Sequence, residues 1–206
     1  MNDTNKTKEI IFDAFVELTS VIGYEKVTVR DIAYKIGKNV ASIYYHFENK
    51  ASMLEYAYDY HAQHQYRNRR STEYMKKLIE SASAEEIVSE FMYTQQSEDQ
   101  KHYIRMILIV KIIYMRIFQD PQANAAFSEN YNNSMDFVTD VMRHGIEIGR
   151  IDPNFDIVTF ADVLIGSMQI MGIKAFADVN YEVRQLDQEK RILDMISRIL
   201  ASAIIK

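Results

Sequence analysis

The sequence predicts an all-α fold of about nine helices. Only six glycines and two prolines interrupt its 206 residues, so long stretches can remain helical. Apolar side chains recur at the three- and four-residue spacing of a helix face, and no segment shows the convincing alternation that is typical of a strand. The expected helices cover approximately residues 5–22, two short segments within 28–47, and 49–66, 83–93, 99–119, 121–149, 155–177 and 186–205.

The first three helices have the clearest boundaries. Gly23 ends the first helix, and Thr28 and Asp31 have the spacing of a capping box that starts the second. Gly37 suits the left-handed residue at the end of the second helix, and Asn39 is a good cap for the third. Two short helices joined by a glycine-containing turn are typical of a helix-turn-helix, whose second helix enters the major groove of DNA.

The later helices follow from caps and breakers. Ser83 and Glu86 have the spacing of a second capping box. The segment 99–119 is apolar nearly all round, which indicates a buried central helix. Pro121 opens the next helix, and a loop at residues 152–154 precedes the last two.

A helix, a glycine and a second helix are common in all-α proteins, so the pattern alone does not establish DNA binding. Paired tyrosines usually pack in a core, and a single histidine usually lies on the surface. The combination in the third helix is more informative, because hydroxyl and imidazole N–H groups bond phosphate oxygens. That helix carries Ser42, Tyr44, Tyr45 and His46.

The segment from Gly23 to Leu54 resembles the DNA-binding domain of TetR-family (tetracycline-repressor-like) transcriptional regulators. The resemblance implies an N-terminal three-helix DNA-binding domain at residues 1–48 and a helical ligand-binding and dimerisation domain at 49–206. The matching residues are Gly23, Thr28, Ile32, Ala33, Gly37, Ser42, Ile43, Tyr44, His46, Phe47, Lys50 and Leu54.

Three positions depart from the family's usual pattern. Ile36 stands where the family usually has Ala, Lys38 where it has a small apolar residue, and Ala41 where it often has Gly or Pro. None disrupts the motif. The segment 38–41 lies where family members vary to read different operators, so the resemblance implies DNA binding without implying which DNA.

The resemblance also implies roles for individual residues. Phosphate contacts are expected from Thr28, Tyr44, His46 and Lys50. Thymine methyl groups suit apolar side chains, and base edges suit amides and hydroxyls. The candidates for base readout are Arg30, Lys38, Asn39, Val40, Ala41, Ser42 and Tyr45.

Charge and composition fit a cytoplasmic DNA-binding protein. The net charge is −5, but residues 1–50 hold seven Lys/Arg and seven Asp/Glu, leaving 17 against 22 in the remainder. A locally basic surface is what DNA binding requires. The absence of cysteine excludes disulfides and thiolate metal sites. No secretory segment is expected at the N-terminus, and the apolar stretch 104–118 is too short and too charged to span a membrane.

The last two helices predict a homodimer. Packing within the monomer accounts for part of their apolar stripes, and the resemblance implies that they form a four-helix bundle with a second copy. A two-fold dimer would bind a near-palindromic operator. The expected interface residues are Ile165, Met168, Ile192, Ile196, Ile199 and Ala203.

The chain's 14 Tyr, ten Phe and 11 Met suggest a pocket for a small-molecule effector. Ordinary core packing is the alternative for each residue. The candidates are Tyr93, Tyr103, Tyr114, Phe118, Phe137, Met142, Met168 and Met171. The charge of the effector stays open, because Arg105, Lys111 and Arg116 suit an anion whereas Asp136, Asp140 and Asp162 suit a cation.

No catalytic motif or cofactor site is apparent, and the chain is not expected to be an enzyme. His61 and His64 offer half of a metal site at most, so no metal is expected. The predicted function is a repressor released from DNA by a small molecule. The alternatives are a DNA-binding regulator controlled by a protein partner or by no effector, and a helical metalloenzyme around His61 and His64.

Overall fold

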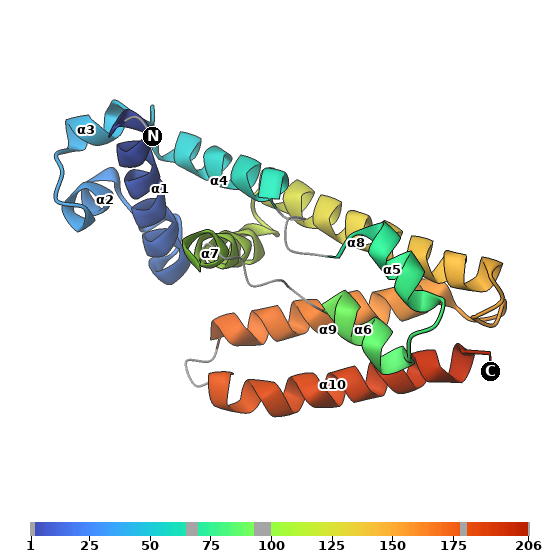
Figure 1. Cartoon of the computed structure of the whole chain (residues 1–206). Helices are drawn as coiled ribbons and strands as arrows, with labels where there is room; N and C mark the ends of the chain where they lie inside the picture. The colour runs from blue at the N-terminus through green and yellow to red at the C-terminus, as the bar shows by residue number, and fades with distance from the viewer. Residues whose placement is uncertain (1–2, 65–69, 93–99, 178–180, 206) are drawn as a thin grey trace. The chain divides into compact units, whose positions relative to one another are not determined.

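The computed structural model describes residues 3–64, 70–92, 100–177 and 181–205, and no β-strand forms within these ranges. This confirms the predicted all-α fold. The described ranges contain ten helices (Figure 1): α1 (Asp3–Ile22), α2 (Val29–Lys35), α3 (Val40–Tyr44), α4 (Lys50–His64), α5 (Thr72–Ile79), α6 (Ala84–Met92), α7 (Gln100–Arg116), α8 (Pro121–Glu147), α9 (Ile157–Ala177) and α10 (Tyr181–Ala203).

The prediction of nine helices omitted α5. This helix begins after Ser71, whose side chain accepts a hydrogen bond from the Tyr74 backbone N–H. It buries only Met75 and Ile79, one turn apart. Its four apolar residues, Tyr74, Met75, Leu78 and Ile79, have the three- and four-residue spacing of a helix face, so the signal for this helix was present in the sequence.

The chain divides into two compact units, residues 1–67 with 96–128 and residues 68–95 with 129–206. We call them the first and second unit. The first unit includes α4 and α7, which both lie after residue 48 in the sequence. They pack against each other and against α1. The functional boundary at residue 48 stays a prediction.

The core of the first unit is built around α1. Phe12 and Phe15 are fully buried there with Ile32 of α2, Ile43 of α3 and Met53 of α4. Full burial of one side chain of this size contributes about 1.5–3 kcal/mol to stability. The core therefore fixes α2 and α3 on α1 and sets which faces remain exposed.

The second unit is organised around α10, which packs on α6 and α9. Its core includes Ile87, Met142, Leu164, Ile196 and Leu200, all fully buried. The Arg150 guanidinium donates to the carbonyls of Ala82 and Ile205. These bonds tie the loop after α5 and the end of the chain to the turn after α8.

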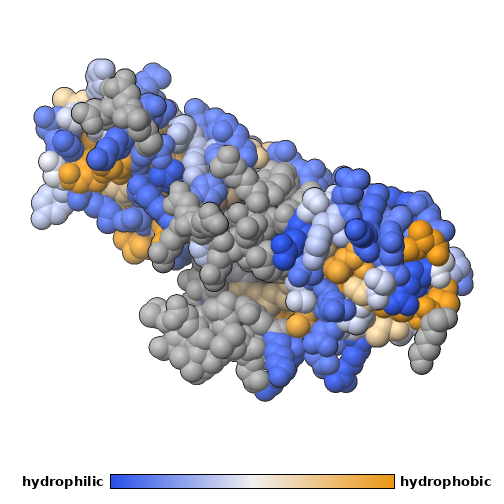
Figure 2. All heavy atoms as spheres, in the orientation of Figure 1, coloured by the Kyte–Doolittle hydropathy of each residue, from blue (hydrophilic) through white to orange (hydrophobic). Residues whose placement is uncertain are grey.

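Much of α9 is not covered by this core. The stretch Ile157–Lys174 is long and apolar enough to cross a membrane by length and composition, and only 22% of it is buried. A single helix of this kind is weak evidence for a membrane span. The visible surface of the second unit shows apolar atoms among hydrophilic ones (Figure 2).

Candidate nucleic-acid interface

The capping box that starts α2 is formed as predicted. Thr28 Oγ1 accepts from the Asp31 backbone N–H at 3.2 Å, and the Thr28 backbone N–H donates to Asp31 Oδ2 at 2.8 Å. The Thr28 hydroxyl also donates to Asp31 Oδ2 at 2.7 Å. These bonds, the side-chain one first, lower the pKa of the Asp31 carboxyl.

The turn between α2 and α3 also has the expected chemistry. Gly37 has a φ of 64°, in the left-handed region that favours glycine. The Asn39 Oδ1 atom caps α3 by accepting from the Ser42 backbone N–H at 2.8 Å and from the Ser42 hydroxyl at 2.9 Å. Ile43 of α3 and Phe47 after it are buried, and Val40 packs partly against the same core, whereas Ala41 and Tyr44 are exposed.

The predicted phosphate contacts differ in their surroundings. Thr28 is exposed, although its hydroxyl hydrogen is committed to Asp31. Tyr44 is exposed. His46 is half-buried, and its ring packs edge-to-face on the Tyr45 ring with the ring centroids 5.0 Å apart. Tyr44 and His46 could therefore donate to a phosphate with less rearrangement of existing hydrogen bonds than Thr28.

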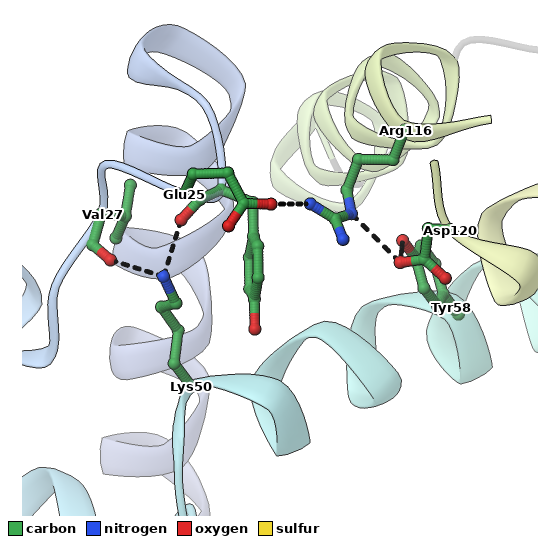
Figure 3. A network of polar contacts seen from close by, with 7 residues as sticks. Glu25, Val27, Lys50, Tyr58, Arg116 and Asp120 are labelled. Atoms are coloured by element: carbon green, nitrogen blue, oxygen red, sulfur yellow. Dashed lines mark hydrogen bonds and ion pairs between the residues drawn. The ribbon is translucent and has the colours of Figure 1, made fainter. Parts of the chain in front are cut away.

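Lys50 has a structural role that the sequence did not reveal. Its Nζ donates to the carbonyls of Tyr24 at 2.8 Å and Val27 at 2.9 Å (Figure 3), and it lies 4.1 Å from the centroid of the Tyr24 ring. An ammonium has three N–H donors, so one remains for a phosphate. Lys50 therefore holds the α1–α2 turn against the start of α4.

Most candidates for base readout are accessible. Val40 and Ser42 are half-buried, and Tyr45 is 77% exposed. Arg30, Lys38, Asn39 and Ala41 are exposed as well.

Tyr34 on α2 is 91% exposed and was not among the sequence candidates. It lies four residues after Arg30, hence on the same helix face. That spacing is the signal that could have identified it.

A polar network joins the α1–α2 turn to the end of α7 (Figure 3). Arg116 Nη1 lies 2.7 Å from Glu25 Oε1, and Arg116 Nε lies 3.1 Å from Asp120 Oδ2. The Tyr58 hydroxyl donates to the same Asp120 oxygen at 2.9 Å. The Arg116 guanidinium also lies 4.4 Å from the centroid of the Tyr24 ring.

Within this network, burial acts to raise the pKa of the Asp120 carboxyl. The hydrogen bonds from Tyr58 and Arg116 outweigh burial, so the pKa is lowered. The carboxylate thus stays ionised and remains a partner for Arg116.

The eight candidate pocket residues do not assemble in one unit. Tyr93 lies outside the described residues. The first unit holds Tyr103, Tyr114 and Phe118, whereas the second holds Phe137, Met142, Met168 and Met171.

Three of these residues do not have the surroundings of pocket-lining residues. Phe118 is 96% exposed and faces solvent. Phe137 and Met142 are buried in the core of the second unit. Phe137 packs edge-to-face on Phe91 there, with the ring centroids 5.6 Å apart. Ordinary packing accounts for these last two, and the pocket stays a prediction.

The charges that suggested an effector are largely engaged within the protein. Arg105 is paired with Glu9 and Asp13, and Arg116 with Glu25 and Asp120. Asp140 is paired with Lys76 at 2.9 Å, and Asp162 accepts from Tyr131. Four of the six side chains are therefore weak indicators of the effector's charge.

The predicted subunit interface needs correction. Ile165, Ile196 and Ala203 are buried in the core of their own unit, so they are not available to a second copy. Met168 and Ile192 are half-buried, and Ile199 is 37% exposed. Apolar side chains that are more exposed than Ile199 lie elsewhere on the same two helices: Val158, Ile170, Ile173 and Met195.

The histidines of α4 have separate surroundings. His61 is buried, whereas His64 Nδ1 lies 2.7 Å from the Tyr60 carbonyl oxygen, to which it donates. Within the described ranges, no group of three His, Asp or Glu side chains could hold a metal ion.

Comparisons with known proteins agree with this geometry. Residues 11–57 match the family model described as bacterial regulatory proteins, tetR family. A TetR-family transcriptional regulator from Cytophaga hutchinsonii aligns over 100% of this chain and 98% of its own, with 13% identity and a TM-score of 0.63. A comparison with curated proteins gives no significant match.

Two further solved structures contain small molecules. A Saccharomonospora viridis protein in complex with choline has 16% identity and a TM-score of 0.60, over 98% of this chain and 99% of its own. The SmeT–triclosan complex has 14% identity and a TM-score of 0.56, over 98% and 93%. The N-terminal segment therefore belongs to the tetR family of bacterial regulatory proteins, and the whole chain has the fold of TetR-family transcriptional regulators.

Proposed function

We propose that this protein is a ligand-responsive transcriptional repressor that binds a near-palindromic operator as a homodimer and is released by a small molecule. The observation that carries the DNA-binding part is the outer face of α3. Tyr44 and Tyr45 are 52% and 77% exposed there while Ile43 is fully buried. Such a helix can enter a major groove without losing its packing on α1 and α2.

DNA binding predicts a specific effect of Lys50→Met. The substitution keeps the apolar stem but removes the charge, so affinity should fall about equally for all sequences. The slope of log affinity against log salt concentration should fall by about one. Titrations at several salt concentrations, with genomic fragments selected by the purified protein, measure both quantities.

Lys77→Met is the matched control, because it removes the same charge from an exposed position on α5. It should leave the slope unchanged. Lys50 also bonds the Tyr24 and Val27 carbonyls, so thermal unfolding is followed in parallel. A Lys50→Met protein that is folded and has the wild-type salt slope would exclude the phosphate contact.

The exposed apolar face of α9 and α10 supports the homodimer. Ile170 is 50% exposed and Met195 48%. Removing apolar surface from water contributes about 25 cal/mol per Å², so burying this face against a second copy is favourable. A two-fold dimer also places two α3 helices on one operator.

Ile170→Glu should convert the dimer to a monomer, because a charge in an apolar interface is desolvated without a partner. Val21→Glu is the control, since Val21 is 78% exposed on α1 and should leave the mass unchanged. Analytical ultracentrifugation at micromolar concentration distinguishes the two. A wild-type monomer, or a dimeric Ile170→Glu protein, would contradict the proposed interface.

The effector is proposed by analogy with the choline and triclosan complexes of similar fold. Release requires that the molecule bind better to a conformation whose two α3 helices do not fit the operator. A few kcal/mol of differential affinity shifts the protein from mostly bound to mostly free. Linkage then requires operator DNA to weaken effector binding by the same factor.

A further inference from the structure

The outer face of α3 offers less polar chemistry than its sequence suggests. Asn39 Oδ1 accepts from the Ser42 backbone N–H at 2.8 Å and from the Ser42 hydroxyl at 2.9 Å. An amide identifies adenine through its oxygen and its nitrogen together, and the Asn39 oxygen is already engaged. The Ser42 hydroxyl has given its only proton to Asn39, so it can only accept. The bonds between these two residues stabilise α3 and limit what either can read on a base.

Ala41 and Tyr45 present an accessible apolar surface on the same helix. Ala41 is exposed and Tyr45 is 77% exposed, whereas Val40 packs partly on the core. Tyr45 follows α3 with helical φ and ψ of −66° and −29°, and its backbone N–H donates to the Ala41 carbonyl at 3.1 Å. Residues four apart in a helix are neighbours on one face. The Ala41 methyl and the Tyr45 ring therefore belong to one surface.

The chemistry of this surface selects one of the four bases. Arg30 and Lys38 of the same helix-turn-helix are exposed cations, which complement the phosphates of DNA. Thymine is the only base whose edge carries a methyl group in the major groove. The other three bases present hydrogen-bond donors and acceptors there, which a methyl and the face of a ring cannot satisfy.

We propose that Ala41 and Tyr45 together contact the 5-methyl group of one thymine in each half of the operator. The inference rests on the proposed function, because it requires α3 to lie in the major groove. It assigns specificity at this position to an apolar contact instead of to Asn39 and Ser42. The operator is therefore expected to carry thymine at equivalent positions of its two halves.

Deoxyuridine tests the contact, because it lacks only the methyl group of thymidine and pairs with adenine in the same way. Genomic fragments bound by the purified full chain are narrowed to one operator, and each thymine is replaced in turn. Loss of one buried methyl group corresponds to about 4-fold weaker binding. Replacement at the contacted position in both halves should therefore weaken binding about 15-fold.

Variants assign this loss to the two side chains. Ala41→Gly and Tyr45→Ala should each reduce the ratio of the thymine and deoxyuridine affinities to about 4-fold or less. Any destabilisation of α3 affects both fragments alike, so it leaves the ratio unchanged. Tyr45→Phe keeps the ring and should retain the wild-type ratio. Ser42→Ala should retain it as well.

The outcomes separate this inference from the proposed function. A wild-type protein that tolerates deoxyuridine at every thymine of its operator would overturn the inference while DNA binding stands. A wild-type ratio in both Ala41→Gly and Tyr45→Ala would do the same, and loss of the ratio in Tyr45→Phe would assign the discrimination to the hydroxyl instead. A wild-type protein that selects no fragment would contradict DNA binding itself, and the inference with it.

Discussion

Arg105→Met is expected to lower the free energy of unfolding by about 3 kcal/mol. Arg105 lies on α7 and is only 8% exposed. Its Nη1 lies 2.6 Å from Glu9 Oε2, and its Nε and Nη2 lie 2.7 and 2.6 Å from Asp13 Oδ1. One cation thus joins α7 to two carboxylates of α1.

The aromatic surroundings of Arg105 make its loss more costly. The guanidinium lies 5.0 Å from the centroid of the Tyr60 ring and 5.4 Å from that of Phe12. Methionine fills similar volume but leaves the two carboxylates without this partner. Breaking a buried pair costs about 3–5 kcal/mol, and the lower end applies because Glu9 and Asp13 side chains keep 27% and 19% exposure.

Arg198→Met is the matched control, because it removes the same group from an exposed pair with Asp194. Exposed pairs of this spacing contribute at most about 0.5 kcal/mol. Urea unfolding measures both variants. Adding Glu9→Gln to Arg105→Met should restore part of the loss if the cost arises from unpaired charge. Equal, small effects of the two arginine substitutions would contradict the role of Arg105.

Arg105 also shows which interactions a sequence can reveal. Its apolar neighbours suggested a buried helix, and its charge suggested an anionic effector. The actual partner, Asp13, is 92 positions away, and no spacing rule reaches that far. By contrast, the Thr28–Asp31 and Asn39–Ser42 bonds join residues three apart, so local spacing predicted both.

The residues expected at a dimer interface show the same limit of local spacing. Ile196 and Ile199 fall on one predicted stripe of α10, yet Ile196 is fully buried and Ile199 is 37% exposed. A broad apolar stripe on a helix can pack on the core along one edge and remain open to a second copy along the other. The spacing of the apolar residues predicts the helix. It does not predict which of these residues are buried, because that depends on where α6 and α9 pack on α10.

His61 predicts the second large effect, a loss of stability between pH 6.5 and pH 4.5. The imidazole on α4 is 4% exposed, and its Nδ1 has no hydrogen-bond partner within the described ranges. Burial disfavours the charged form and lowers the pKa of His61 to about 4. The folded protein therefore keeps this ring neutral at pH values where an exposed histidine is protonated.

The sign follows from proton binding in the two states. Between pH 6.5 and about 4 the unfolded chain binds a proton at His61 and the folded chain does not, so acid favours unfolding. One pKa unit corresponds to about 1.4 kcal/mol, which gives a loss of about 2–3 kcal/mol from pH 6.5 to pH 4.5. The contribution becomes constant about one pH unit above the ordinary histidine pKa of 6.5.

Chemical denaturation at half-unit pH steps should show that His61→Gln flattens the dependence in this window, whatever its absolute stability. His46→Gln, the same substitution at a histidine that is only half-buried, is measured beside it as the matched comparison. The carboxyls with lowered pKa, such as Asp31 and Asp120, start from an ordinary pKa of 3.8, so their contribution to stability is lost mainly below the window. A wild-type slope in His61→Gln would therefore show that His61 is protonated in the folded protein.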